Sequence, residues 1–236
     1  MNLATFETEH YTFHFTVGSY AQAHVREAAA LQEACLAYIT KVLNVDFPHR
    51  IHYYLCDTPQ QVGQIYGDDD PCNGFAVIPD RIYAVYNENV QCLGMHEDAH
   101  LVSYFINRPN SAALREGLAM FFDRKWWGIS NMEWAGMYLQ KDRIPPLRVL
   151  LDDECFFDMS DTLTYPIMGA FTEYLILTYS NEKYRKLYAC KGSLTLAFAE
   201  LYYRSVETLD EEFCAYLRIF RMDGVVLERM ETLLNA

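Results

Sequence analysis

The sequence predicts an α+β protein, with a small mixed sheet in the N-terminal third and helices through most of the remainder. Period-two alternation of apolar and polar residues, which is typical of half-buried strands, is confined to the first 90 or so residues. From residue 89 onward the apolar residues recur at helical spacing. The chain has 236 residues and is 51% hydrophobic, so it can bury a substantial core.

The elements of the N-terminal third follow from local patterns. Residues 11–16 alternate apolar and polar side chains and predict a strand. A long backing helix begins after Ser19, a residue type suited to the N-cap, and continues to Asn44. Further strands are expected where the segments are rich in aromatic and β-branched residues: 51–56, 75–78 and 81–86.

The C-terminal part is predicted to be helical and free of internal repeats. Pro145 and Pro146 mark its one long irregular connection. We expect two subdomains, an α+β subdomain over residues 1–130 and a helical subdomain over residues 131–236. The expected helices are 89–106, 111–125, 131–141, 165–179, 181–203 and 207–220.

Charge and cysteine content limit the partners and the compartment. The formal net charge of -13 comes from acidic residues spread along the chain, which argues against nucleic acid as a partner. No apolar run is long enough to span a membrane, and the N-terminus does not read as a secretory signal. The seven cysteines are scattered and odd in number, so we expect reduced thiols and a cytoplasmic location.

One short motif carries the chemistry. His96-Glu97-Asp98-Ala99-His100 is an HExxH pattern, which on a helix places two imidazoles one turn apart where both can reach one metal ion. Glu97 would then lie beside the water at that metal. The alternative is a surface helix that carries the pattern by chance. The apolar character of the surrounding helix favours the metal, because two uncompensated imidazoles would be costly there.

A catalytic zinc site needs a third protein ligand and one open position. A metzincin would supply glycine and histidine at positions 103 and 106, but this chain has Ser103 and Ile106, which excludes that class. Glu116 is the best carboxylate, since it is polar within a strongly apolar helix. Asp123, two turns further on, is the fallback ligand or a partner for one of the histidines.

For Glu116, the competing interpretation is an exposed helix carboxylate paired with Arg115 or Arg124.

Residues 96–100 and 116–119 resemble the gluzincin metallopeptidases, in particular the peptidase MA-like family, in which HExxH is followed by a helix carrying Glu-Gly-Leu-Ala. Similar segments continue through residues 165–183 and 197–217. The resemblance implies a zincin-like fold with one zinc ion per chain. It also implies that the helical C-terminal subdomain closes the cleft over the zinc-binding helices.

The resemblance also assigns roles. It implies that Glu97 is the general base, taking a proton from the attacking water and passing it to the leaving amine. By the same resemblance, Tyr165 is the candidate residue for stabilising the oxyanion. The competing interpretation is a packed aromatic side chain, which is more common for a tyrosine next to a proline. The strand 81–86 resembles the edge strand that in zincins pairs with an extended peptide.

The function expected from these features is zinc-dependent hydrolysis of peptide bonds in a peptide or protein substrate. Two alternatives stay open. One is a catalytically silent zincin-like scaffold that binds a protein or peptide partner. The other is hydrolysis of a non-peptide amide. The sequence makes no prediction of oligomeric state.

Overall fold

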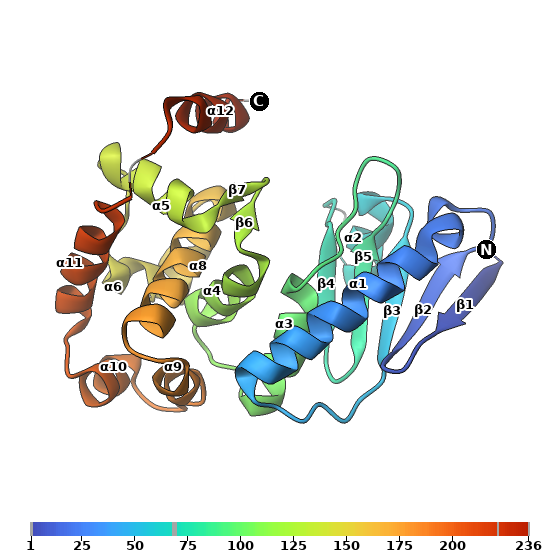
Figure 1. Cartoon of the computed structure of the whole chain (residues 1–236), viewed down its shortest axis with the longest axis horizontal. Coiled ribbons are helices and arrows are strands. Elements are labelled where there is room, and N and C mark those ends of the chain that lie inside the picture. Colours follow the sequence, from blue (N-terminus) through green and yellow to red (C-terminus); the bar gives the residue numbers. More distant parts are fainter. Residues whose placement is uncertain (1, 68–69, 221, 236) are drawn as a thin grey trace. The chain divides into compact units, whose positions relative to one another are not determined.

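The structure, a computed structural model that describes residues 2–67, 70–220 and 222–235, divides into two units, Met1–Ile106 and Asn107–Ala236 (Figure 1). This division lies earlier than the boundary predicted at residue 130. The helix after residue 111 belongs to the second unit because it packs along a later helix of that unit. The assignment of residues 131–236 as a cleft-closing subdomain stays a prediction.

The first unit is built on a mixed sheet. Its strand order is β1-β2-β3-β5-β4, in which β2, β3 and β5 run parallel and the two outer strands pair antiparallel to their neighbours. The predicted strands are confirmed, and β1 is an addition. The bounds are β1 Leu3–Glu7, β2 Tyr11–Thr16, β3 Ile51–Cys56, β4 Gly74–Val77 and β5 Arg81–Val85.

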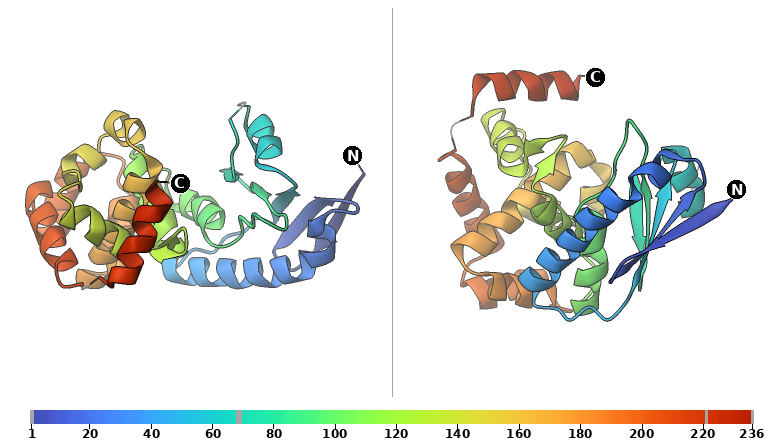
Figure 2. Two further views of the ribbon diagram at one scale, coloured as in Figure 1. Left: turned by 90° about the horizontal axis from the view of Figure 1, so that it is seen from above. Right: turned by 45° about the vertical axis from the view of Figure 1, so that its right-hand side comes forward.

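Helices cover both faces of this sheet (Figure 2). Helix α1, Tyr20–Leu43, begins where the Ser19 side chain accepts the Gln22 N–H and ends at Asn44 in a left-handed conformation, as predicted. It packs on the face that carries the buried aromatic residues of β2. The short helix α2, Pro59–Tyr66, covers part of the opposite face through Val62. The unit therefore has a core on each side of the sheet.

Helix α3, His96–Ile106, closes the first unit and begins seven residues later than predicted. The Asn87 carboxamide accepts the N–H groups of Asn89 and Val90, which makes a turn incompatible with a helix there. Gly94 then adopts a φ of 133°, which favours glycine. The expected start at residue 89 was wrong because side chain to backbone bonds outcompete the helical periodicity.

The second unit is mostly helical. Helix α4 lies along α8, with α5 packed against α8 as well. Across the described residues of the whole chain, none of the helices combines the length and apolar character needed to cross a bilayer. The bounds are α4 Ala112–Asp123, β6 Lys125–Trp126, β7 Ile129–Ser130, α5 Asn131–Gln140, α6 Leu147–Leu150, α7 Asp153–Asp158, α8 Asp161–Thr178, α9 Asn181–Tyr188, α10 Leu194–Tyr202, α11 Val206–Leu217 and α12 Gly224–Leu234.

Two predicted helices of this unit differ from the observed ones. The segment 181–203 is split into α9 and α10, because Ser193 caps a new helix by accepting the Leu196 N–H. Helix α8 starts four residues before the predicted Tyr165 and so contains Pro166. Pro166 has no N–H to donate to the carbonyl of Thr162, four residues before it. The Tyr138 hydroxyl donates to that carbonyl instead, at 2.9 Å.

The glycine of the Glu-Gly-Leu-Ala segment is explained by the packing of α4 on α8. A Cβ at Gly117 would lie 2.9 Å from Thr172 Oγ1 and 3.0 Å from the Met168 carbonyl oxygen. We expect Gly117→Ala to lower the free energy of unfolding by about 1–3 kcal/mol, because the backbone of α8 must move. Denaturant unfolding measures this.

Gly224→Ala is the matched control for that substitution. A Cβ at this first residue of α12 meets no atom within 4 Å, so the change is expected to leave stability unchanged or to raise it slightly. Equal stabilities of the two variants would contradict the close packing of α4 and α8.

Candidate metal centre

The two histidines of the HExxH motif lie on the first turns of α3. His96 is the first residue of the helix, and His100 follows one turn later with only 7% of its surface exposed. Their ring centroids are 4.9 Å apart and their planes are nearly perpendicular, at 81°. His100 also stacks on Tyr104, with centroids 5.4 Å apart. The helix thus presents both imidazoles to one side, as the spacing predicted.

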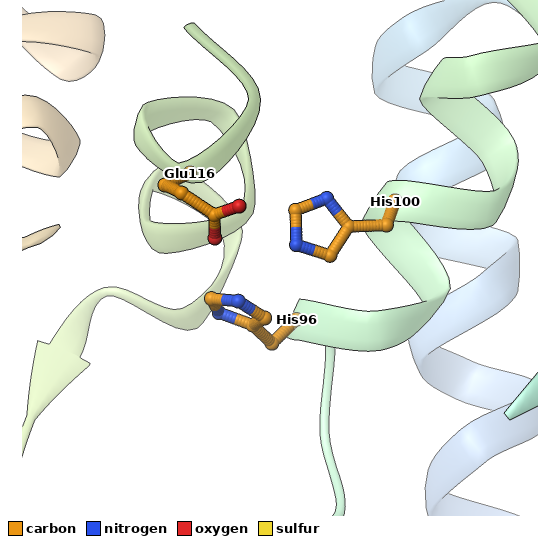
Figure 3. A group of neighbouring side chains, drawn as sticks. All are labelled: His96, His100 and Glu116. Carbon is orange, nitrogen blue, oxygen red and sulfur yellow. The ribbon is translucent and has the colours of Figure 1, made fainter. Parts of the chain in front are cut away.

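The third member of the group is Glu116 of α4. His96, His100 and Glu116 each offer a ligand atom, and these atoms all lie within 4.8 Å of one another. Figure 3 shows the carboxylate and the two rings turned toward a common space. Among the described residues, no other cluster of histidine, cysteine or acidic side chains meets this geometry. Two imidazoles and one carboxylate are the donor set of a catalytic zinc site with an open position.

Local bonds in the second unit hold the N-terminal end of α4. Asp153 accepts the N–H of Ala112, the first residue of α4, at 2.7 Å. The Arg115 guanidinium donates to the Pro109 carbonyl at 2.7 Å, so it also holds the loop that leads into the helix. Glu116 itself is half-buried, not exposed as the competing interpretation required.

Asp123, the fallback ligand, is the last residue of α4. It does not belong to the group formed by the two histidines and Glu116 in the described part of the chain. Its role as a partner for one of those histidines stays a prediction.

Glu97, the predicted general base, lies against the sheet of its own unit. It is half-buried on the first turn of α3. A Cβ built at Gly74 of β4 would lie 3.3 Å from Glu97 Oε1 and 3.3 Å from Cys92 Sγ. Glycine at position 74 therefore lets β4 run close to the carboxylate.

The edge strand of the sheet is β4, and the expectation that residues 81–86 form the edge was wrong. That segment is β5, which pairs with β3 on one side and β4 on the other. The Val85 N–H donates to the Asn73 carbonyl. Because bonded and non-bonded positions alternate in an antiparallel pair, Gly74 and Ala76 direct their N–H and C=O groups away from β5. These groups are of the kind that an extended peptide can pair with.

Tyr165, the candidate oxyanion residue, is part of an aromatic cluster in the second unit. Its ring stacks on Trp126, with centroids 5.7 Å apart, and meets Phe156 edge to face at 6.0 Å. Trp127 and Trp134 extend the same cluster. These contacts favour the packing role that the sequence left open, and the oxyanion role stays a prediction.

Sequence reasoning missed a buried polar network behind α3. Asp98 is fully buried, and its Oδ2 accepts bonds from the Tyr11 hydroxyl at 2.8 Å and from Gln32 Nε2 at 2.7 Å. The Gln32 carboxamide also donates to the Gly94 carbonyl and accepts the Gly94 N–H, both at 2.9 Å. Burial raises the pKa of Asp98 well above its usual value, and the nearby Glu97 charge adds to this. An acidic residue facing the apolar side of a predicted helix was the available signal.

No protein-family model matches the chain, and no curated protein matches it. A statement about function therefore depends on the geometry of the site.

Proposed function

We propose that this protein is a zincin-like, gluzincin-type zinc metallopeptidase that binds one zinc ion through His96, His100 and Glu116. The observation that carries the proposal is the convergence of the three ligand atoms within 4.8 Å. Zinc is bound by histidine nitrogen and carboxylate oxygen at about 2.0–2.2 Å, so donors clustered at this range need only small adjustments to meet one ion. Bound zinc would supply Lewis acidity and lower the pKa of a water at the site toward about 7.

Glu97 is the general base in this proposal. It follows His96 directly, so its carboxylate is held on the same helical turn as a metal ligand. Its role is to accept a proton from the attacking water and to pass that proton to the leaving amine. The close approach of Gly74 to Glu97 supports this role, because it brings the edge strand beside the base.

The substrate we propose is an extended peptide segment. The outward N–H and C=O of Ala76 on β4 would pair with the main chain of such a segment. Main-chain pairing is independent of side-chain identity, so it suits a peptide better than a small non-peptide amide. Tyr165 as the oxyanion residue and a cytoplasmic location remain parts of the proposal.

The test measures zinc content and peptide hydrolysis on the same preparation. We expect about one zinc per chain and cleavage of a mixed-sequence peptide library near neutral pH. Removal of zinc by a chelator should abolish cleavage, and added zinc should restore it.

Each outcome of this test separates the alternatives. A protein that binds no zinc would refute the metal centre. Zinc binding without cleavage of any library peptide would instead favour the silent scaffold. Cleavage that continues after complete removal of zinc would refute the metal-dependent mechanism.

A further inference from the structure

We propose that Gln32 and Asp98 are positioning residues that fix the first turn of α3 and thereby the orientation of His96 and Glu97. The inference rests on the proposed zinc peptidase function. Neither side chain is in the ligand group, and both are fully buried. They act through the helix that carries the ligands.

A single side-chain amide bonds to the chain on both sides of His96 and Glu97, through the backbone of Gly94 before them and the side chain of Asp98 after them. Gln32 Nε2 donates to the Gly94 carbonyl at 2.9 Å and to Asp98 Oδ2 at 2.7 Å. Gln32 Oε1 accepts the Gly94 N–H at 2.9 Å. One anchor therefore lies two residues before His96, and the other lies one residue after Glu97.

These anchors fix both the position and the rotation of the helix. An α-helix turns by about 100° and rises about 1.5 Å per residue, so a small slip would swing both imidazoles away from a shared ion. The Gly94 bonds hold the entry to the helix, and Gly94 itself adopts a φ of 133°. The Asp98 bonds hold the rotation, because position 98 lies about 200° around the helix from position 96, on the side opposite the imidazole of His96.

The network draws on three elements of the first unit. Tyr11 belongs to β2 and Gln32 to α1, while Asp98 belongs to α3. The Tyr11 hydroxyl shares its one proton between Asp98 Oδ2, at 2.8 Å, and the Gln32 backbone carbonyl, at 3.1 Å. One set of hydrogen bonds thus joins the sheet, helix α1 and helix α3, which carries the two histidines. Gln32 and Asp98 contribute directional hydrogen bonds in addition to burial. An apolar pair at these positions would not specify the rotation of α3 about its axis.

The first experiment compares Gln32→Met with Ile39→Val, a buried control two turns further along α1. The zinc affinity of each variant is measured by competition with a chromophoric chelator, under conditions where circular dichroism shows it folded. We expect Gln32→Met to weaken zinc binding about 10–100-fold, the range typical of residues that orient metal ligands. The control should keep wild-type affinity. The visible spectrum of the cobalt-substituted protein should change in Gln32→Met alone, because it reports ligand geometry.

A double variant tests the coupling directly. Gln32→Glu places two carboxylates together and is expected to weaken zinc binding by a similar factor. Adding Asp98→Asn should restore part of the affinity, since the new amide at position 98 can donate to the new carboxylate at position 32. Strictly additive losses would refute the proposal.

The outcomes also distinguish this inference from the proposed function. If wild-type protein binds no zinc, the metal centre itself fails. If wild-type protein binds zinc and Gln32→Met binds it equally well with an unchanged cobalt spectrum, only the positioning role fails.

Discussion

Replacing Glu97 by glutamine is expected to lower peptide hydrolysis by about 10²–10⁴-fold, the usual contribution of a general base. The side chain keeps its size but loses the ability to accept a proton. Because Glu97 is outside the ligand group, zinc content should stay at the wild-type level. Steady-state rates on a peptide that the wild type cleaves, together with metal analysis of the same sample, provide the measurement.

Glu27→Gln is the matched control for this change. Glu27 is an exposed carboxylate on α1, so its loss should leave both zinc content and rate unchanged. Full activity in Glu97→Gln would show that another group takes the proton. Loss of zinc together with activity would show instead that Glu97 supports the metal.

Replacing Glu116 by alanine is expected to weaken zinc binding by more than about 100-fold. Changes to residues that merely orient ligands cost about 10–100-fold, and the loss of a direct ligand should exceed that range. The measurement is zinc affinity by chelator competition, with the folded state checked by circular dichroism.

Asp123→Ala on the same helix decides between the two carboxylates. Its zinc affinity should fall less than that of Glu116→Ala, by no more than about 100-fold, because Asp123 is outside the ligand group and can at most orient a ligand. If Asp123→Ala loses zinc while Glu116→Ala retains it, the third ligand has been assigned to the wrong carboxylate.

The elements that the sequence predicted well are those whose signal is local. Residues 11–16 alternate apolar and polar side chains, residues 51–56 are rich in aromatic and β-branched residues, and they form β2 and β3 with the predicted bounds. Helix α1 is preceded by Ser19, which caps it, and is followed by Asn44 in a left-handed conformation. Both residue types mark helix ends in a sequence, so both ends could be predicted. Short-range hydrogen bonds and periodicity decide such elements almost independently of the rest of the chain.

The errors occurred where a turn interrupts an apolar pattern. Residues 89–95 have helical spacing, yet the Asn87 side chain and Gly94 hold them in a different conformation. Residues 181–203 also keep the spacing across the break between α9 and α10. Periodicity records which side chains face the core, and it does not record whether the backbone between them is continuous.

The edge of the sheet was another feature beyond the sequence. Both β4 and β5 were predicted as strands, but their order in the sheet depends on which strand pairs with β3. That choice places β4 at the edge and Gly74 beside Glu97. Strand order is a property of long-range pairing, so no local pattern reveals it.

The sequence by itself determined the α+β class and the pair of histidines one helical turn apart, because helical geometry alone relates positions 96 and 100. Tertiary structure decided what surrounds that pair. Asp98 is visible in the sequence as an acidic residue on the apolar side of a predicted helix, but only the fold shows that it is buried against Tyr11 and Gln32. The physical reason is distance along the chain: contacts between residues more than 60 positions apart form only when packing brings their elements together.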